Sequence, residues 1–263
     1  MKFNFASVAA TAALAAAVSV AHADPVQINE QNLGLGGYVV NNVGKLNGGY
    51  VETITINPNG TFGATAFATF GQYYDTNGLV VSSVGAGRKT DLGRDYTLFA
   101  VFNASGYVDG PNTFKGTAGS FTLYAATDVV NPVFGADGYS SVTYTTAGNV
   151  FELATSTVML EGDGVGIGQP VSAFKFLFDP INLTADGKKF FTAPDPFYMS
   201  VNVTGDVDEG LSGTSPGTFQ NVKGDVSAVF TGTNEVPEPA TLALVGVALA
   251  GLGLGRRRKN AAK

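Results

Sequence analysis

Apolar and polar residues alternate with a period of two along much of residues 24–235. In the segment Tyr50–Ile56, Tyr50, Ile54 and Ile56 share one face, and the other face carries Val and Thr. A period of two is typical of half-buried β-strands, whereas an amphipathic helix repeats about every 3.6 residues. No sustained helical repeat interrupts the pattern. The alternation recurs in eight further segments: 62–70, 96–102, 121–125, 142–144, 151–153, 174–178, 199–203 and 226–230.

Turn-forming residues separate these segments. Residues 57–60 read Asn-Pro-Asn-Gly, a strong hairpin signal because Asn and Gly accept the positive φ angles of tight turns. Similar clusters lie at 75–78, 136–138 and 185–187. About ten strands at this spacing predict an all-β ectodomain over residues 24–235, an antiparallel β-sandwich or a jelly roll. The 19 Phe and 10 Tyr residues supply its core.

The first 23 residues have the three parts of a secretory signal peptide. Lys2 gives a positive charge, residues 6–20 form an apolar run rich in Ala and Val, and the sequence Ala-His-Ala follows. Ala21 and Ala23 occupy the two small-residue positions of the cleavage pattern. We therefore expect residues 1–23 to be removed and the mature chain to begin at Asp24.

Residue types missing from the mature chain exclude several chemistries. The sequence has no Cys, and its single His, His22, falls within the predicted signal peptide. A Ser-His-Asp triad, a thiolate nucleophile and a His-ligated zinc site are therefore not expected. Between Asp24 and Glu238 lie nine basic and 21 acidic residues, a net charge near −12. Such an acidic region repels nucleic acid, so nucleic acid is not an expected partner.

The C-terminus has a second tripartite arrangement, in residues 236–263. Pro237-Glu238-Pro239 is followed by the uncharged stretch 240–255 and by a basic end, 256–263, that contains three Arg and two Lys residues. Sixteen helical residues rise about 24 Å, which is short for a membrane span near 30 Å, but terminal Arg side chains extend it. The stretch predicts a short transmembrane helix with its basic end in the cytoplasm.

This tail closely resembles the PEP-CTERM sorting domain of Gram-negative bacteria. Motif, helix and basic end occur together in the order of that family, with Pro237, Glu238 and Pro239 as the sorting motif. The resemblance implies export across the inner membrane and transient insertion of the tail there. It also implies processing by an exosortase and delivery to the cell surface or extracellular matrix. The motif residues would be recognised by the exosortase and would catalyse nothing themselves.

Carboxylates are the remaining candidates for chemistry. Asp206, Asp208 and Glu209 are candidate calcium ligands, because calcium binds carboxylate and carbonyl oxygens in loops. The EF-hand pattern is absent, and a solvated acidic turn is the alternative interpretation. Two carboxylates at the correct separation also suffice for glycoside hydrolysis. With 21 acidic residues, however, close pairs arise by chance, so we expect no enzyme and assign no catalytic residue.

A second resemblance lies within the ectodomain. Residues 45–56 read Lys-Leu-Asn-Gly-Gly-Tyr-Val-Glu-Thr-Ile-Thr-Ile, and 60–62 and 66–72 continue the similarity. This stretch resembles the flocculation-associated PEP-CTERM proteins. The resemblance implies a structural or adhesive role in floc or biofilm formation, with extracellular polysaccharide as partner. The alternative is a calcium-supported carbohydrate-binding module, in which exposed Tyr73 and Tyr74 would stack on sugar rings.

Overall fold

A computed structural model describes residues 25–110, 113–135, 142–165, 172–195, 197, 199–207, 217 and 219–232. The chain divides into two units, and every described residue belongs to the unit Ala23–Thr233. The other unit comprises Met1–His22 and Asn234–Lys263. The predicted signal peptide and the predicted sorting tail therefore lie outside the described residues.

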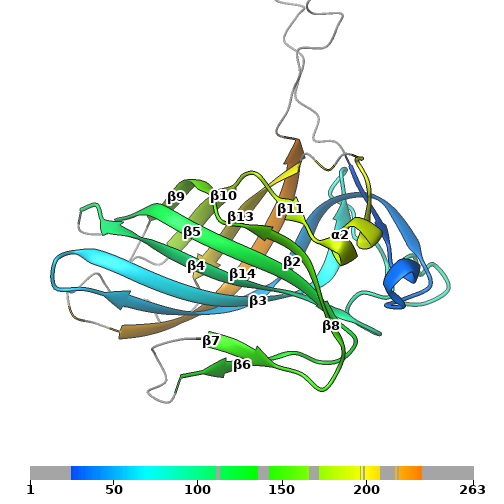
Figure 1. The fold of residues 1–263 in the computed structure, drawn as a ribbon, viewed down its shortest axis with the longest axis horizontal. Helices are drawn as coiled ribbons and strands as arrows, with labels where there is room; N and C mark the ends of the chain where they lie inside the picture. The colour runs from blue at the N-terminus through cyan, green and yellow to red at the C-terminus, as the bar shows by residue number, and fades with distance from the viewer. Residues whose placement is uncertain are drawn as a thin grey trace, which may run out of the picture. The chain divides into compact units, whose positions relative to one another are not determined.

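The described part is built mostly of β-strands (Figure 1). The strands include two long ones, β2 and β3, that form a hairpin, and the only described α-helix is short. In chain order the elements are β1 (Val26–Asn29), η1 (Gln31–Leu33), β2 (Val39–Ile56), β3 (Thr61–Asp75), β4 (Thr97–Val108), β5 (Thr113–Ala126), β6 (Asn131–Phe134), β7 (Val142–Thr145), β8 (Val150–Ser156), β9 (Met159–Val165), β10 (Ser172–Phe178), β11 (Asn182–Leu183), α2 (Ala185–Phe190), β12 (Phe191–Ala193), β13 (Met199–Val207) and β14 (Phe219–Gly232).

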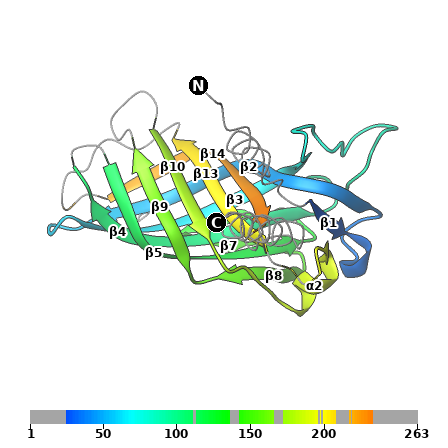
Figure 2. The same ribbon diagram turned by 90° about the horizontal axis from the view of Figure 1, so that it is seen from above.

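Twelve of the strands form one antiparallel sheet that curls back on itself. Along its main path the order is β11-β8-β5-β4-β3-β2-β14-β13-β10-β9, and β9 also pairs with β5. The pairing of Thr113–Lys115 with Asp163–Val165 closes the curl. Figure 2 shows the strands of the two walls crossing over one another. The predicted all-β, antiparallel class is confirmed, and its two facing layers are parts of a single continuous sheet.

The inner face of the curl holds the main core. Alternate residues of each strand point inward, so the pattern that marked the strands in the sequence also fills the interior. Phe102, Phe121 and Phe178 pack against one another with ring centroids 5.2–6.2 Å apart. They come from three different strands and are almost fully buried. These ring contacts join opposite walls of the sheet without Trp or disulfides.

The β6–β7 hairpin covers one half of the outer face. Val142 of the hairpin packs with Phe67 and Phe99 of the sheet in a second buried cluster, and Phe99 stacks on Tyr124 with a centroid distance of 4.9 Å. Tyr144 of the hairpin meets Phe99 edge-on at 4.6 Å. Strands β3 and β4 are thus buried on both faces over this half, which explains why residues 99–102 are continuously apolar.

The predicted turns at 57–60 and 75–78 are confirmed. Gly60 and Gly78 have φ angles of 80° and 79°, and the Asp75 carboxylate accepts bonds from the Asn77 and Leu79 amides at 2.9 Å. The cluster 136–138 lies outside the described residues. The prediction of a turn at 185–187 was wrong, because these residues begin the helix α2.

Local capping explains the start of α2. The Thr184 hydroxyl accepts a bond from the Gly187 amide at 3.0 Å, so it satisfies a backbone donor at the first turn of the helix. Asp186 in the first turn and Lys189 in the last turn have the charges that the helix dipole favours, and they pair at 2.8 Å. These residues are also common in turns, so the sequence pattern alone did not separate the two structures.

Candidate functional site

The structure describes only some of the candidate site residues that the sequence analysis named. Pro237, Glu238 and Pro239, the cleavage positions Ala21 and Ala23, and the calcium candidates Asp208 and Glu209 lie outside the described residues. Asp206 lies in β13 opposite Ala173, and its side chain is not among those described. Within the described part, no three His, Cys, Asp or Glu side chains come together to hold a metal. The calcium site stays a prediction.

Tyr73 is not available for stacking on a sugar. Its side chain is fully buried, and its hydroxyl lies 2.8 Å from that of Tyr96. Burial raises the pKa of Tyr73 well above its ordinary value. Tyr74, on the opposite face of β3, stacks under Lys45, whose Nζ lies 4.2 Å from the ring centroid. The expectation of an exposed tyrosine pair was therefore wrong for Tyr73, because period-two alternation points adjacent residues to opposite faces.

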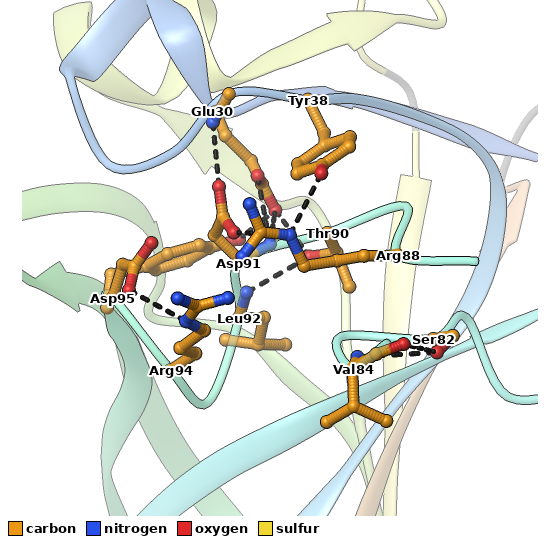
Figure 3. A network of polar contacts seen from close by, with 12 residues as sticks. Glu30, Tyr38, Ser82, Val84, Arg88, Thr90, Asp91, Leu92, Arg94 and Asp95 are labelled. Atoms are coloured by element: carbon orange, nitrogen blue, oxygen red, sulfur yellow. Dashed lines mark hydrogen bonds and ion pairs between the residues drawn. The ribbon is translucent and has the colours of Figure 1, made fainter. Parts of the chain in front are cut away.

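The Tyr96 hydroxyl connects Tyr73 to a buried carboxylate, that of Glu30. Figure 3 shows Glu30 beside Thr90 and Asp91. Glu30 follows β1, is fully buried, and accepts bonds from the Tyr96 hydroxyl at 3.0 Å and from the Thr90 hydroxyl. The Asp91 amide donates to both of its carboxylate oxygens at 3.1 Å. Burial raises the pKa of Glu30, and these hydrogen bonds oppose the rise. These hydrogen bonds connect the end of β1 to the loop between β3 and β4.

Asp91 extends the network toward the surface. Its Oδ2 accepts a bond from the Gly37 amide at 2.8 Å, and its Oδ1 lies 3.4 Å from Arg88 Nε. Arg88 Nε also donates to the Tyr38 hydroxyl at 2.9 Å, a bond that raises the pKa of the guanidinium. A Cβ at Gly36 would overlap both Glu30 and Asp91, so only glycine permits this close approach. The side chains of Glu30, Asp91 and Arg88 all interact with neighbouring residues of the network, which indicates a structural role.

Among the side chains that the structure describes, Glu52 is an unexpected charge-bearing residue in the interior of the curled sheet. It lies on β2 between Val222 and Ala66 of the neighbouring strands, on the same face as Tyr50 and Ile54. Its carboxyl group makes no hydrogen bond or ion pair with any described residue. Desolvation by burial raises its pKa to about 7. Glu52 alternates in phase with Tyr50 and Ile54, so the pleat of the strand directs it to the inner face although its charge favours the outer one.

The cavity beside Glu52 is small. It is lined by alanines of β3 and β4 on one side and by Phe174, Phe176 and Phe178 of β10 on the other. Its volume of about 20 Å³ accommodates about one water molecule. Among its described lining residues Glu52 provides the only carboxyl group. Two carboxylates are needed for the common routes of glycoside hydrolysis, so this cavity does not support the glycosidase alternative.

The uncovered half of the outer face has a different character. Thr53 of β2 lies opposite Thr65 of β3, which lies opposite Asn103 of β4, which lies opposite Ser120 of β5. Thr65 Oγ1 donates to Asn103 Oδ1 at 3.1 Å. Neighbouring strands are about 4.8 Å apart, so the four side chains form a row across the sheet. We call this row, with the residues that line the groove around it, the polar groove.

The polar groove is open and uncharged. Its volume is about 600 Å³, and its described lining contains hydroxyl, amide and small side chains with no Asp, Glu, Lys or Arg. The lining residues are Thr53, Thr55, Asn57, Gly63, Ala64, Thr65, Asn103, Ala104, Ser105, Ala118, Gly119, Ser120 and Thr157. Hydroxyl and amide groups both donate and accept hydrogen bonds, so they match a neutral polyhydroxylated chain better than an ion. Sequence reasoning missed this groove because strand order decides which threonines become neighbours.

The comparisons with known proteins find a match in the C-terminal residues. Among the described residues, no helix has the length and apolar character needed to cross a membrane. Residues 235–259 match the family model of the PEP-CTERM protein-sorting motif, which defines the class: an exported protein that is sorted through its C-terminal segment. The matched motif indicates an exosortase-processed protein and implies export across the inner membrane to the cell surface. No curated protein and no solved structure matches the chain.

Proposed function

We propose that this PEP-CTERM protein is a structural or adhesive component of the extracellular matrix that supports floc or biofilm formation and catalyses no reaction. The polar groove is the observation that carries the proposal, because its lining is suited to a neutral polysaccharide. A shallow surface groove with hydroxyl and amide groups holds a sugar chain by many weak hydrogen bonds. Such binding suits adhesion, where many copies act together on one polymer.

The same proposal includes the route to the matrix. Residues 240–255 span the inner membrane transiently, and an exosortase recognises Pro237, Glu238 and Pro239 and processes the tail. The match at residues 235–259 supports this route. The acidic mature region, with a net charge near −12, keeps the released protein soluble and away from other anionic polymers.

Binding to the matrix polysaccharide of the native host tests the adhesive role. The protein recovered from the extracellular fraction is titrated with that polysaccharide by calorimetry, with and without a chelator. We expect binding that persists in the chelator. Loss of binding in the chelator would instead favour the calcium-supported carbohydrate-binding module, with Asp206, Asp208 and Glu209 as ligands. No binding under either condition would contradict the adhesive role.

The glycosidase alternative has its own readout. Incubation of the same protein with the same polysaccharide should release no reducing sugar above the background of the polysaccharide alone. Sustained release, proportional to protein concentration, would contradict the non-enzymatic proposal. The pair of carboxylates responsible would then have to be sought outside the cavity that contains Glu52.

A further inference from the structure

An open groove with exposed aliphatic side chains lies where β2 begins. It is formed by the first residues of β2 and by the segment 79–89, which we call the apical loop, and its volume is about 590 Å³. Leu79 and Val80 line it and are 65% and 51% exposed. Val84, at the middle of the apical loop, is 75% exposed. Clustered exposed aliphatic side chains on a soluble unit mark an interaction surface.

The apical loop is held in place at both ends. At its start Asp75 accepts the Leu79 amide at 2.9 Å and its own amide donates to the Leu79 carbonyl at 2.9 Å. At its end Arg88 is fixed by Tyr38 and Asp91, two residues of the network around Glu30 (Figure 3). The exposed aliphatic side chains are therefore presented on a fixed base.

The strand register places this groove at the end of the unit from which the tail continues. In the β14–β2 ladder, Val229 opposite Lys45 is the last pair toward the start of β2, and β14 continues to Gly232 in its ladder with β13. Asn41 and Asn42, just beyond, line the groove. The last described residue of β14 is Gly232, and the matched sorting motif begins at residue 235. Eight residues from Gly232 to the apolar stretch at 240 reach at most about 30 Å.

We propose that the groove of the apical loop is a lipid-surface contact, through which the folded unit rests on the outer face of the inner membrane while its tail is still attached. Leu79, Val80 and Val84 enter the headgroup boundary, as the apolar side chains of peripheral proteins do. The described lining of the groove includes two basic residues, Arg88 and Lys89, and one carboxylate, Asp75. Arg88 is already paired with Asp91, so charge contributes less than the aliphatic side chains.

The contact is a step beyond the proposed function and rests on its transmembrane tail. The chain is acidic overall, and that net charge repels an anionic surface, so apolar contact must drive the docking. The short tether makes the contact effectively intramolecular, because the tail holds the groove at high local concentration near the bilayer. After processing the tether is lost, and the contact becomes weak enough to release the protein.

The absence of native Cys allows a site-specific test on the full chain. Val84→Cys is labelled with an environment-sensitive fluorophore, and the protein is reconstituted into vesicles of zwitterionic and anionic phospholipids. Tyr107→Cys, which is 44% exposed at the opposite end of β4, is the matched control, and Val247→Cys reports insertion of the tail. We expect blue-shifted emission and protection from aqueous iodide at positions 84 and 247 but not at 107.

Each outcome has a distinct meaning. Protection at 247 without protection at 84 would overturn the lipid contact and leave the membrane tail intact. No protection at 247 would overturn both, because the tether would not reach the bilayer. Adding Leu79→Ser and Val80→Ser to the protein labelled at position 84 should abolish its protection while position 247 stays protected. Protection at 84 that survives both substitutions would also contradict the proposal.

Discussion

Thr65 and Asn103 face each other across the β3–β4 ladder, and the Thr65 hydroxyl donates to Asn103 Oδ1 over 3.1 Å. The pair lies at the middle of the polar groove, on the half of the outer face that the β6–β7 hairpin leaves uncovered. The two halves of one sheet face thus differ sharply: aromatic and covered on one side, hydroxylated and open on the other. This division is the structural basis for the proposed adhesive role.

The double variant Thr65→Val, Asn103→Leu should weaken binding to the matrix polysaccharide about tenfold or more, because each lost hydrogen bond contributes about 1 kcal/mol. Both side chains lie on the surface of the sheet, so the fold should be retained. Calorimetric titration of the variant measures the effect. Thr143→Val, on the covering hairpin and outside the groove, is the matched control and should bind as the unmodified protein does. Equal binding by all three proteins would exclude the groove as the binding surface.

Glu52→Gln should stabilise the protein at alkaline pH. The folded-state pKa of Glu52 is raised from 4.5 to about 7, so the folded protein holds this proton more tightly than the unfolded chain. The free energy of unfolding therefore falls as pH rises from about 4.5 to about 7 and stays at its lower value above that. One pKa unit corresponds to about 1.4 kcal/mol, so the loss is at most about 3–4 kcal/mol, and water reaching the carboxyl reduces it.

Urea unfolding at a series of pH values measures this effect. The Glu52→Gln protein should lack the decline between pH 4.5 and 7 that the unmodified protein shows, and it should be the more stable of the two at pH 8. Glu152 is an exposed residue of β8, so Glu152→Gln provides a control for the general effect of removing one negative charge. If the free energy of unfolding of Glu52→Gln depends on pH as that of the unmodified protein does, the Glu52 carboxyl of the unmodified protein is well solvated.

Tyr96→Phe should lower the free energy of unfolding by about 1–3 kcal/mol, because it removes the hydroxyl that Glu30 and Tyr73 both contact. The change leaves two buried oxygen atoms with one partner fewer and alters no apolar packing. The midpoint of urea unfolding at neutral pH reports the loss. Tyr107→Phe removes an exposed hydroxyl and should leave the midpoint unchanged. A Tyr96→Phe protein as stable as this control would show that the network contributes nothing net.

The alternation of residues was enough to predict the strands but not their full lengths. Tyr50–Ile56 alternates clearly, whereas β2 begins at Val39 and includes Gly44, Gly48 and Gly49. Glycine has low strand propensity, so no local signal predicts a strand there. The ladders with β3 and β14 hold this part of β2 extended, and only the folded sheet reveals them.

Side-chain surroundings were harder to predict than strands. The alternating segment 62–70 ended before Tyr73, which lies within β3, and the burial of Tyr73 depends on Tyr96, which is 23 residues away. The polar groove depends on four strands lying side by side, which a single sequence does not specify. The sorting motif, in contrast, could be recognised from the sequence alone, because it depends only on the local order of residues. The match at 235–259 confirms it and needs no knowledge of the fold.

Glu238→Ala should leave the ectodomain folded but trap the protein in the inner membrane, because the exosortase would no longer recognise its motif. Fractionation of the native host, followed by detection of the protein in the membrane and extracellular fractions, measures the change. Glu235→Ala, which lies just before the motif, is a charge-matched control and should be released normally. Normal release of Glu238→Ala would contradict the role of the motif.

The central claim is that the chain is processed at both ends and leaves the membrane. Intact mass spectrometry of the protein from the extracellular fraction of its host tests it most directly. The account predicts a chain that begins at Asp24 and ends near Pro237 to Pro239, with any added mass belonging to a group attached after processing. A chain that retains its tail through Lys263 would contradict the claim and would make this an ordinary membrane-anchored protein.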